Sequence, residues 1–148
     1  MKLTISRILH AGYLFEHGAT RIVFDPIFES PFSVNCHAFP AVAFDRAAIA
    51  ELELAAIFIS HFHDDHCSFE SLALLRRDTP LYVYCAFEEL FVMLRALGFS
   101  RVFALELDVP VTVGGFEVTP RRALDPGVDS LFQIRAGGLA AQLVPAQA

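Results

Sequence analysis

The sequence predicts a mixed α/β fold, and the order of its apolar segments carries this prediction. Three short apolar or alternating segments open the chain with turn residues between them, which indicates antiparallel strands. Short apolar runs then alternate with segments whose apolar residues recur at helical spacing. Two further runs around a Gly-Gly pair are typical of a closing hairpin. Strands that alternate with helices after an antiparallel start indicate a mixed sheet.

The first three strands are expected at residues 3–9, 12–17 and 20–25, because turn signals separate these apolar or alternating segments. Asp25 and the proline after it end the third strand, since proline cannot donate to a strand ladder. A long connection rich in phenylalanine follows over residues 27–44. Loops of this length are usually functional, so we expect a lid or wall over the histidine-rich site that comes next in the chain. A loop packed for structural reasons alone is the alternative.

Helices are expected where a capping residue precedes apolar residues at helical spacing. Asp45 is expected to cap a short helix through Leu52, and Ser68 a helix through Arg77. A third amphipathic helix is expected over residues 86–97, which a glycine ends. The remaining strands are expected at residues 55–59, 81–84, 101–105, 110–113, 116–120, 130–135 and 139–144.

Length and composition exclude several classes of protein. The 148 residues predict a single domain over residues 1–148, and 55% apolar residues are ample for its core. No apolar run approaches the ~18–20 residues of a membrane helix. A net charge of −6 without a basic block argues against nucleic acid as a partner. Arg7 stands where the apolar region of a signal peptide would run, so a cytoplasmic protein is expected.

A cluster of metal-ligand side chains follows the expected strand at 55–59. Three of the six histidines lie within six residues, with two aspartates between them; the cluster is His61, His63, Asp64, Asp65 and His66. Side chains in a strand repeat every two residues, so His61 and His63 can reach one metal ion. Asp65 and His66 can serve a second ion beside it. Imidazole with carboxylate suits zinc, and also iron or manganese. A surface loop that is rich in His and Asp by chance is the alternative.

The hexapeptide from His61 to His66 resembles the His-x-His-x-Asp-His signature of the metallo-β-lactamase fold superfamily. The segments at residues 8–15 and 21–26 resemble the opening hairpin of the same superfamily, with its Asp at the end of the third strand. This resemblance implies an αββα sandwich with mixed sheets, in which each half supplies metal ligands. In some branches a turn with the context of His10 borders the active site; an exposed turn histidine is the alternative.

The resemblance implies a metal-dependent hydrolase that uses a metal-bound hydroxide to attack a small-molecule substrate. It assigns His61 and His63 to a first ion and Asp65 and His66 to a second, so the expected cofactor is zinc, one or two ions, with iron or manganese as alternatives. Asp65 is also the catalytic candidate, because its carboxylate can orient the attacking water. Two alternatives stay open: a di-iron redox protein on the same fold, and a degenerate module that binds metal without catalysis.

The chain departs from the superfamily pattern after its signature, because no histidine follows His66. Asp125 stands near the position of the next expected ligand and is the candidate replacement, with Asp129 as a second choice; both could equally be turn residues. The sequence ends at Ala148, so we expect the C-terminal half of the sandwich to be incomplete. Without a second layer of helices, one face of the later sheet would be apolar, which favours a homodimer that covers it.

Overall fold

The computed structural model describes residues 1–144 and contains two β-sheets. The first sheet has six strands in the order β1-β2-β3-β4-β5-β6. The N-terminal strands β1, β2 and β3 pair antiparallel, whereas β3 to β6 pair parallel. The bounds of these strands are β1 Leu3–Ile8, β2 Gly12–His17, β3 Thr20–Phe24, β4 Ala56–Ile59, β5 Leu81–Val83 and β6 Val102–Ala104. The first sheet is therefore mixed, as the sequence predicts.

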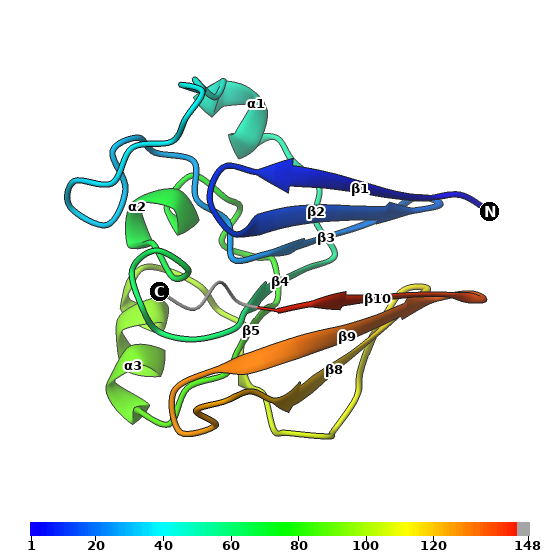
Figure 1. Ribbon diagram of the computed structural model, residues 1–148. Helices are drawn as coiled ribbons and strands as arrows, with labels where there is room; N and C mark the ends of the chain where they lie inside the picture. Colours follow the sequence, from blue (N-terminus) through cyan, green and yellow to red (C-terminus); the bar gives the residue numbers. More distant parts are fainter. Residues whose placement is uncertain (145–148) are drawn as a thin grey trace.

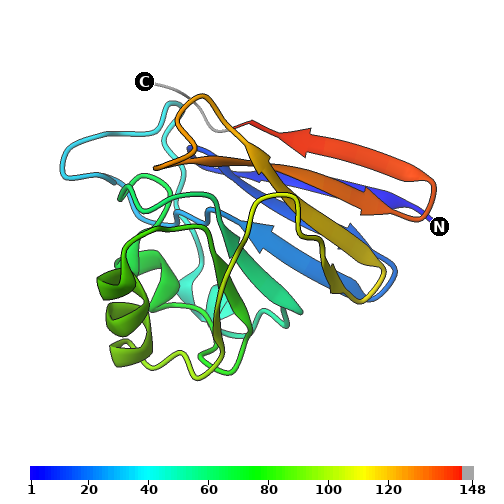
Figure 2. The ribbon, with the colours of Figure 1, turned by 90° about the horizontal axis from the view of Figure 1, so that it is seen from below.

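The second sheet is antiparallel and has four strands in the order β10-β9-β8-β7. Its strands are β7 Val111–Val113, β8 Phe116–Arg122, β9 Ser130–Ala136 and β10 Leu139–Leu143. The two sheets pack against each other, with β1–β3 in the upper half and β8–β10 in the lower half of Figure 1. Helices α1, α2 and α3 pack on the opposite face of the first sheet (Figure 1 and Figure 2). The described residues thus form a helix–sheet–sheet arrangement.

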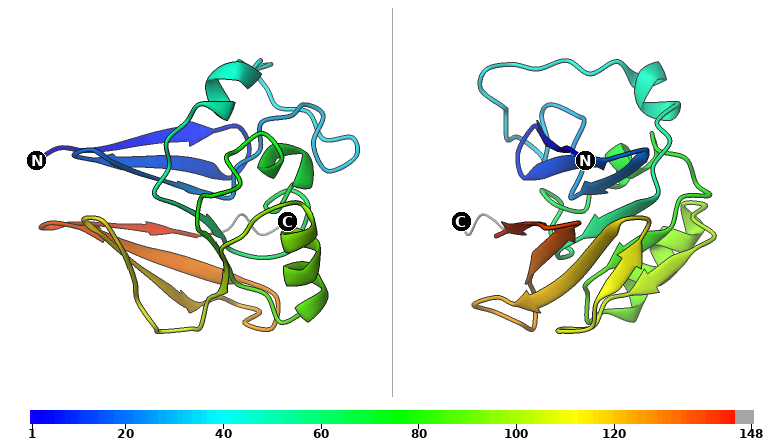
Figure 3. Two further views of the ribbon diagram at one scale, coloured as in Figure 1. Left: turned by 180° about the vertical axis from the view of Figure 1, so that it is seen from behind. Right: turned by 90° about the vertical axis from the view of Figure 1, so that its right-hand side faces the viewer.

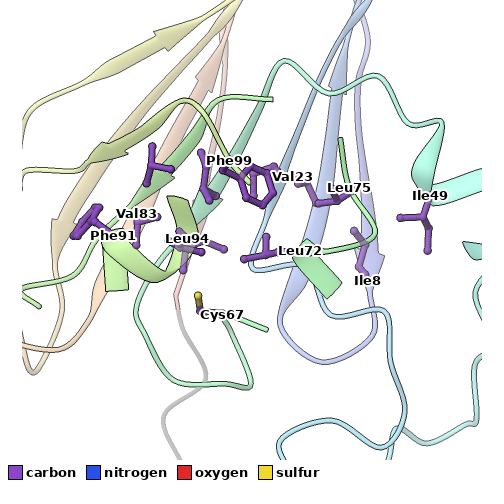
Figure 4. Close-up of a cluster of buried hydrophobic side chains, with 14 residues drawn as sticks. Ile8, Val23, Ile49, Cys67, Leu72, Leu75, Val83, Phe91, Leu94 and Phe99 are labelled. Atoms are coloured by element: carbon purple, nitrogen blue, oxygen red, sulfur yellow. The ribbon is translucent and has the colours of Figure 1, made fainter. Parts of the chain in front are cut away.

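Alternation along the central strands builds both cores. In β4, Ile57 and Ile59 belong to the cluster beneath the helices, whereas Phe58 belongs to the cluster between the sheets. Successive strand residues point to opposite faces, so a strand that is apolar throughout is covered on both sides. Figure 4 shows the helical residues Leu72 and Leu94 in the cluster beneath the helices. All four residues of β4 are buried, which fixes the strand that leads into the histidine cluster.

Two of the helices begin at the predicted caps, and all three are shorter than predicted. Asp45 accepts hydrogen bonds from two backbone amides at the start of α1, and Ser68 accepts one at the start of α2. The helix bounds are α1 Arg46–Ala50, α2 Phe69–Leu72 and α3 Glu88–Ala96. Instead of continuing to Arg77, the chain after α2 turns, and the Arg77 guanidinium donates to carbonyl oxygens of that turn. Within residues 1–144, no helix combines the length and the apolar character that crossing a membrane requires.

The outer face of the second sheet is polar, which corrects the expectation of an apolar face. In β8 the residues Glu117, Thr119 and Arg121 alternate with apolar residues, of which Phe116 and Val118 pack between the sheets. Arg121 donates to Gln133 on the neighbouring strand, 2.9 Å away, so this face forms polar cross-strand contacts. No helix among residues 1–144 covers it. A homodimer stays a prediction, and it has no apolar outer face to support it.

Candidate metal centre

The histidine cluster lies at the C-terminal end of β4, where the chain leaves the first sheet. The strand ends at Ile59, and a tight turn follows in which the amides of His66 and Cys67 donate to the carbonyl oxygen of His63, at 2.9 and 2.7 Å. This turn folds the hexapeptide back on itself. The ring centroids of His61 and His63 are 4.9 Å apart, and those of His61 and His66 are 4.0 Å apart.

Two sets of potential metal ligands meet at Asp65. In the first set, one ligand atom from each of His61, His63 and Asp65 lies within 4.8 Å of the others. In the second set, the same limit holds for His10, Asp65 and His66. The Asp65 Oδ2 atom lies 3.1 Å from His10 Nε2 and 3.6 Å from His66 Nε2. The structure thus brings the four predicted ligands of the signature together and adds His10 to them.

Asp25 orients the buried side chain of His66 through a hydrogen bond to its Nδ1 atom. Its carboxylate accepts hydrogen bonds from the Ser60 amide at 2.7 Å, from the Ser60 hydroxyl at 2.5 Å and from His66 Nδ1 at 2.8 Å. Asp25 is buried and has a positive φ of 44°, a conformation that non-glycine residues rarely adopt. A carboxylate that holds the proton on Nδ1 leaves the lone pair of His66 Nε2 free, which is the arrangement found behind metal-binding histidines.

His66 Nε2 is the atom that best tests whether a metal fits here. It is buried and has no hydrogen-bond partner among the described residues. A buried polar atom without a partner is costly and rare in folded proteins. A cation beside Nε2, Asp65 and the neighbouring imidazoles would satisfy it. The donor set therefore fits a divalent transition metal ion.

Ser60 contacts the Nδ1 atom of His61, as Asp25 contacts that of His66. The Ser60 hydroxyl donates to Asp25 and lies 3.0 Å from His61 Nδ1, so it can accept the proton of Nδ1. This hydrogen-bond pattern leaves His61 Nε2 for a ligand. Asp129 approaches the same Nδ1 atom at 3.3 Å. Both buried imidazoles are thus held by their Nδ1 atoms, and their Nε2 atoms are available.

Burial and neighbouring charges set the pKa values at the centre. Burial, reinforced by repulsion from His66, lowers the pKa of His61 to about 4, so its imidazole is neutral near pH 7. Burial opposes protonation of His66, but the hydrogen bond and charge of Asp25 more than offset it and raise its pKa. Burial also raises the pKa of Asp129. The field around His66 Nε2 favours a positive charge, whether that charge is a proton or a metal ion.

Asp125 does not join the other predicted ligands. Its carboxylate accepts a hydrogen bond from the Gly127 amide at 3.2 Å, and the side chain is exposed in the turn before β9. It belongs to none of the ligand sets found among residues 1–144. Asp129, the second choice of ligand, lies nearer the histidine cluster, with its Oδ1 atom 3.3 Å from His61 Nδ1. It is placed there because the Ser130 hydroxyl donates to the carbonyl oxygen of Ser60 and so joins the start of β9 to the end of β4.

The connection between β3 and α1 borders the centre on one side. It stands out from the body of the molecule in both panels of Figure 3. Phe32 is buried and its ring lies 4.9 Å from that of His10, while the Ser33 hydroxyl donates to Asp64 at 2.6 Å. His37 is exposed. The connection therefore forms a wall beside the site, which is one of the two alternatives that the sequence predicts.

Two hollows adjoin the histidine cluster. A cavity of about 120 Å³ touches His10, His66 and Asp25. A wider groove of about 700 Å³ lies between the β3–α1 connection, the turn after β4 and α3, and it contains Phe62 and Asp64 among its lining residues. The groove has carboxylates and apolar side chains in its lining but no lysine or arginine. A small molecule could therefore lie beside the cluster.

Sequence reasoning assigned no role at the site to Asp25 or Ser60, and it named Asp129 only as a second choice of ligand. Asp25 was visible as the end of the third strand, but not as a hydrogen-bond partner of His66. The parallel pairing of Phe24 with Phe58 is what brings Asp25 next to Ser60, and no local pattern gives that register. An aspartate directly after an apolar strand, beside a second strand that ends in a ligand motif, is the signal that could have found it.

No family model matches the chain. Over 89 aligned residues, which cover 55% of this chain and 14% of the relative, it is 35% identical to cytidine monophosphate-N-acetylneuraminic acid hydroxylase of Danio rerio.

Solved structures resemble nearly the whole chain. The diiron β-hydroxylase CmlA from Streptomyces venezuelae superposes with a TM-score of 0.72 and 21% identity, covering 96% of this chain and 29% of CmlA. A possible metal-dependent hydrolase from Veillonella parvula has a TM-score of 0.72 and 14% identity, over 97% of this chain and 62% of that one. The metallo-β-lactamase fold protein YhfI from Bacillus subtilis has a TM-score of 0.62 and 24% identity, over 91% of this chain and 54% of that one.

The chain therefore spans less than two thirds of the length of each of these proteins. At identities below 25%, the structural matches establish the fold and not the activity. Together with the signature from His61 to His66 and the two packed sheets, they show that this chain has the metallo-β-lactamase fold.

Proposed function

We propose that this chain belongs to a cytoplasmic metal-dependent hydrolase that holds one or two zinc ions. His61, His63, Asp65 and His66 would hold the metal. The observation that carries the proposal is the buried Nε2 atom of His66, which faces Asp65 and has no hydrogen-bond partner among the described residues. The chemistry of the donor set also admits iron or manganese.

The residues around the centre have distinct tasks in this proposal. A zinc ion, when bound, supplies a Lewis acid that polarises a substrate oxygen and brings the pKa of water down to about 7. Asp25 and Ser60 hold the protons of His66 and His61 on their Nδ1 atoms, so both Nε2 atoms stay available. Asp65 has its Oδ2 atom toward His10 and His66, which leaves its Oδ1 atom to accept a proton from attacking water.

The wide groove beside the turn after β4 is where we place the substrate. Phe62 and Asp64 lie on the same turn as the proposed ligands and line this groove. None of the proposed ligands lines the groove itself, so the reactive bond of a substrate would have to extend past Asp64 toward the metal ligands. Apolar walls with a few polar groups are typical of small-molecule sites. We therefore expect a small organic substrate rather than a polymer.

The test is metal-dependent turnover of simple substrates. The purified chain is stripped with a chelator, reloaded with zinc or manganese, and assayed with a nitrophenyl ester, a thioester and a nitrophenyl phosphodiester. We expect hydrolysis of at least one of them to return with the metal and to be absent in the double variant His61→Ala/His63→Ala. Failure of every reloaded ion to restore turnover above that variant would refute hydrolysis.

A second candidate is a di-iron protein that uses oxygen, and the comparisons favour it. The relative matched by sequence is named a hydroxylase, and the structure of CmlA is that of a diiron β-hydroxylase. Imidazole and carboxylate ligands suit iron as well as zinc. Loading with ferrous iron under nitrogen, followed by exposure to oxygen, separates the two candidates. An iron protein should develop visible absorption bands that the zinc-loaded chain lacks; their absence would exclude this candidate.

A further inference from the structure

The turn between β1 and β2 holds His10 beside the metal centre. Leu9, the residue before it, has a positive φ of 47°, which turns the chain sharply after β1. Arg7 donates from Nε to the Leu9 carbonyl oxygen at 3.2 Å and from its terminal nitrogen to the His10 carbonyl oxygen at 2.9 Å. The ring of Phe32 lies 4.9 Å from that of His10 on the side of the β3–α1 connection. His10 is thus held by its backbone and packed on one side of its ring.

The distances around His10 match those between ligands of one metal ion. Zinc–nitrogen and zinc–oxygen bonds of about 2.0–2.1 Å in tetrahedral geometry place neighbouring ligand atoms about 3.3 Å apart. The Asp65 Oδ2 atom lies 3.1 Å from His10 Nε2 and 3.6 Å from His66 Nε2, so the two distances bracket this value. The three ligand atoms lie within 4.8 Å of one another. A small movement of the side chains suffices for all three to reach one ion.

A hydrogen bond between His10 and Asp65 explains only part of this arrangement. A proton on His10 Nε2 would satisfy the Asp65 carboxylate, at 3.1 Å, but it would leave His66 Nε2 buried without a partner. At 3.6 Å, Asp65 is too far from His66 Nε2 for a hydrogen bond. One cation among the three atoms satisfies all of them. The cavity of about 120 Å³ that touches His10 and His66 gives space for an ion and for water.

We propose that His10, Asp65 and His66 bind a second metal ion, so that the turn between β1 and β2 supplies the ligand that the sequence analysis assigned to Asp125. Asp65 would then serve both ions, because it also belongs to the set with His61 and His63. This inference rests on the proposed metal function and adds to it a ligand from outside the signature. It makes the second ion independent of any histidine after His66.

The experiment is a metal titration of three chains. The wild type, His10→Ala and His37→Ala are stripped of metal and titrated with cobalt(II), which replaces zinc and reports its ligands by visible absorption. His37 is the matched control, since it lies near His10 on the exposed β3–α1 connection and belongs to no ligand set found among residues 1–144. His10→Gln is a further variant that fills the space without an imidazole. Thermal unfolding of the metal-free chains checks that each variant folds.

We expect two equivalents of cobalt in the wild type and in His37→Ala. In His10→Ala and His10→Gln the first equivalent should bind as before, and the second at least about tenfold more weakly, since even loss of a group that merely orients a ligand costs that much. Two equally tight equivalents in the His10 variants would overturn the inference but leave the proposed function intact. A single equivalent in the wild type that the His10 variants keep would also overturn it. No binding to the wild type would refute the proposed function itself.

Discussion

Replacement of Asp25 with asparagine should weaken metal binding although Asp25 is not among the four proposed ligands. The carboxylate accepts from the Ser60 amide, the Ser60 hydroxyl and His66 Nδ1. An asparagine has one acceptor oxygen and one donor nitrogen in the same space. With its nitrogen toward His66, it forces the histidine proton from Nδ1 to Nε2, the atom that would bind the metal. If the asparagine nitrogen lies toward the Ser60 amide, two buried N–H donors face each other without an acceptor.

Either orientation has a measurable cost. A hydrogen bond to a charged group contributes about 1.5–3 kcal/mol, and Asp25→Asn should lower the free energy of unfolding by an amount in this range. Loss of the group that orients a metal-binding histidine reduces metal affinity about 10–100-fold, which corresponds to roughly 1.4–2.8 kcal/mol. The variant should therefore keep its fold while it loses much of its metal affinity.

Urea unfolding of the metal-free chain gives the first quantity, and zinc titration against a chelator gives the second. The nitrogen chemical shifts of His66 report which ring nitrogen carries the proton. Asp45→Asn is the matched control, because asparagine caps a helix as well as aspartate does and Asp45 lies at α1. If Asp25→Asn binds zinc within threefold of the wild type and keeps the proton on Nδ1, the reasoning about Asp25 is wrong.

Three further substitutions test the first metal position, Asp125 and the buried thiol of Cys67. The double variant His61→Ala/His63→Ala should bind one equivalent of metal fewer than the wild type and stay folded; a metal content equal to that of the wild type in elemental analysis would contradict this. Asp125→Ala should bind metal as the wild type does, since its carboxylate only caps a turn, and a drop in the metal titration would restore it as a ligand. Burial raises the pKa of the Cys67 thiol from 9.0 to about 12, so the folded chain keeps a proton that the unfolded chain loses. Between about pH 9 and pH 12, ionisation of this thiol should lower the free energy of unfolding by about 1.4 kcal/mol per pH unit. Urea titrations should show that Cys67→Ala removes this slope.

The sequence predicted the fold because its patterns are local. Apolar runs of the right length located the strands, and the alternation of burial in β4 follows from its uninterrupted apolar residues. The polar outer face of the second sheet could have been predicted in the same way, since Glu117, Thr119 and Arg121 alternate with apolar residues or proline in β8. The expectation of an apolar face was wrong because it followed from the missing layer of helices and not from that alternation.

The surroundings of the site could not be predicted, because long-range packing determines them. Asp25 and His10 come from the N-terminal hairpins, and only the order of strands in the first sheet brings them to the end of β4. The choice between Asp125 and Asp129 depends on where the second sheet docks on the first. The hydrogen bond from Ser130 to the carbonyl oxygen of Ser60 fixes that docking, and no spacing along the chain encodes it.

The most direct test of the metal centre is elemental analysis of the purified chain, before and after reloading with zinc and with iron. We expect at least one transition metal ion per chain, and two if His10 completes the second position. Zinc that copurifies with the chain would favour the hydrolase, and iron would favour the di-iron candidate. A chain that folds but retains less than a tenth of an equivalent of any reloaded ion would contradict the proposal that His61, His63, Asp65 and His66 form a metal site.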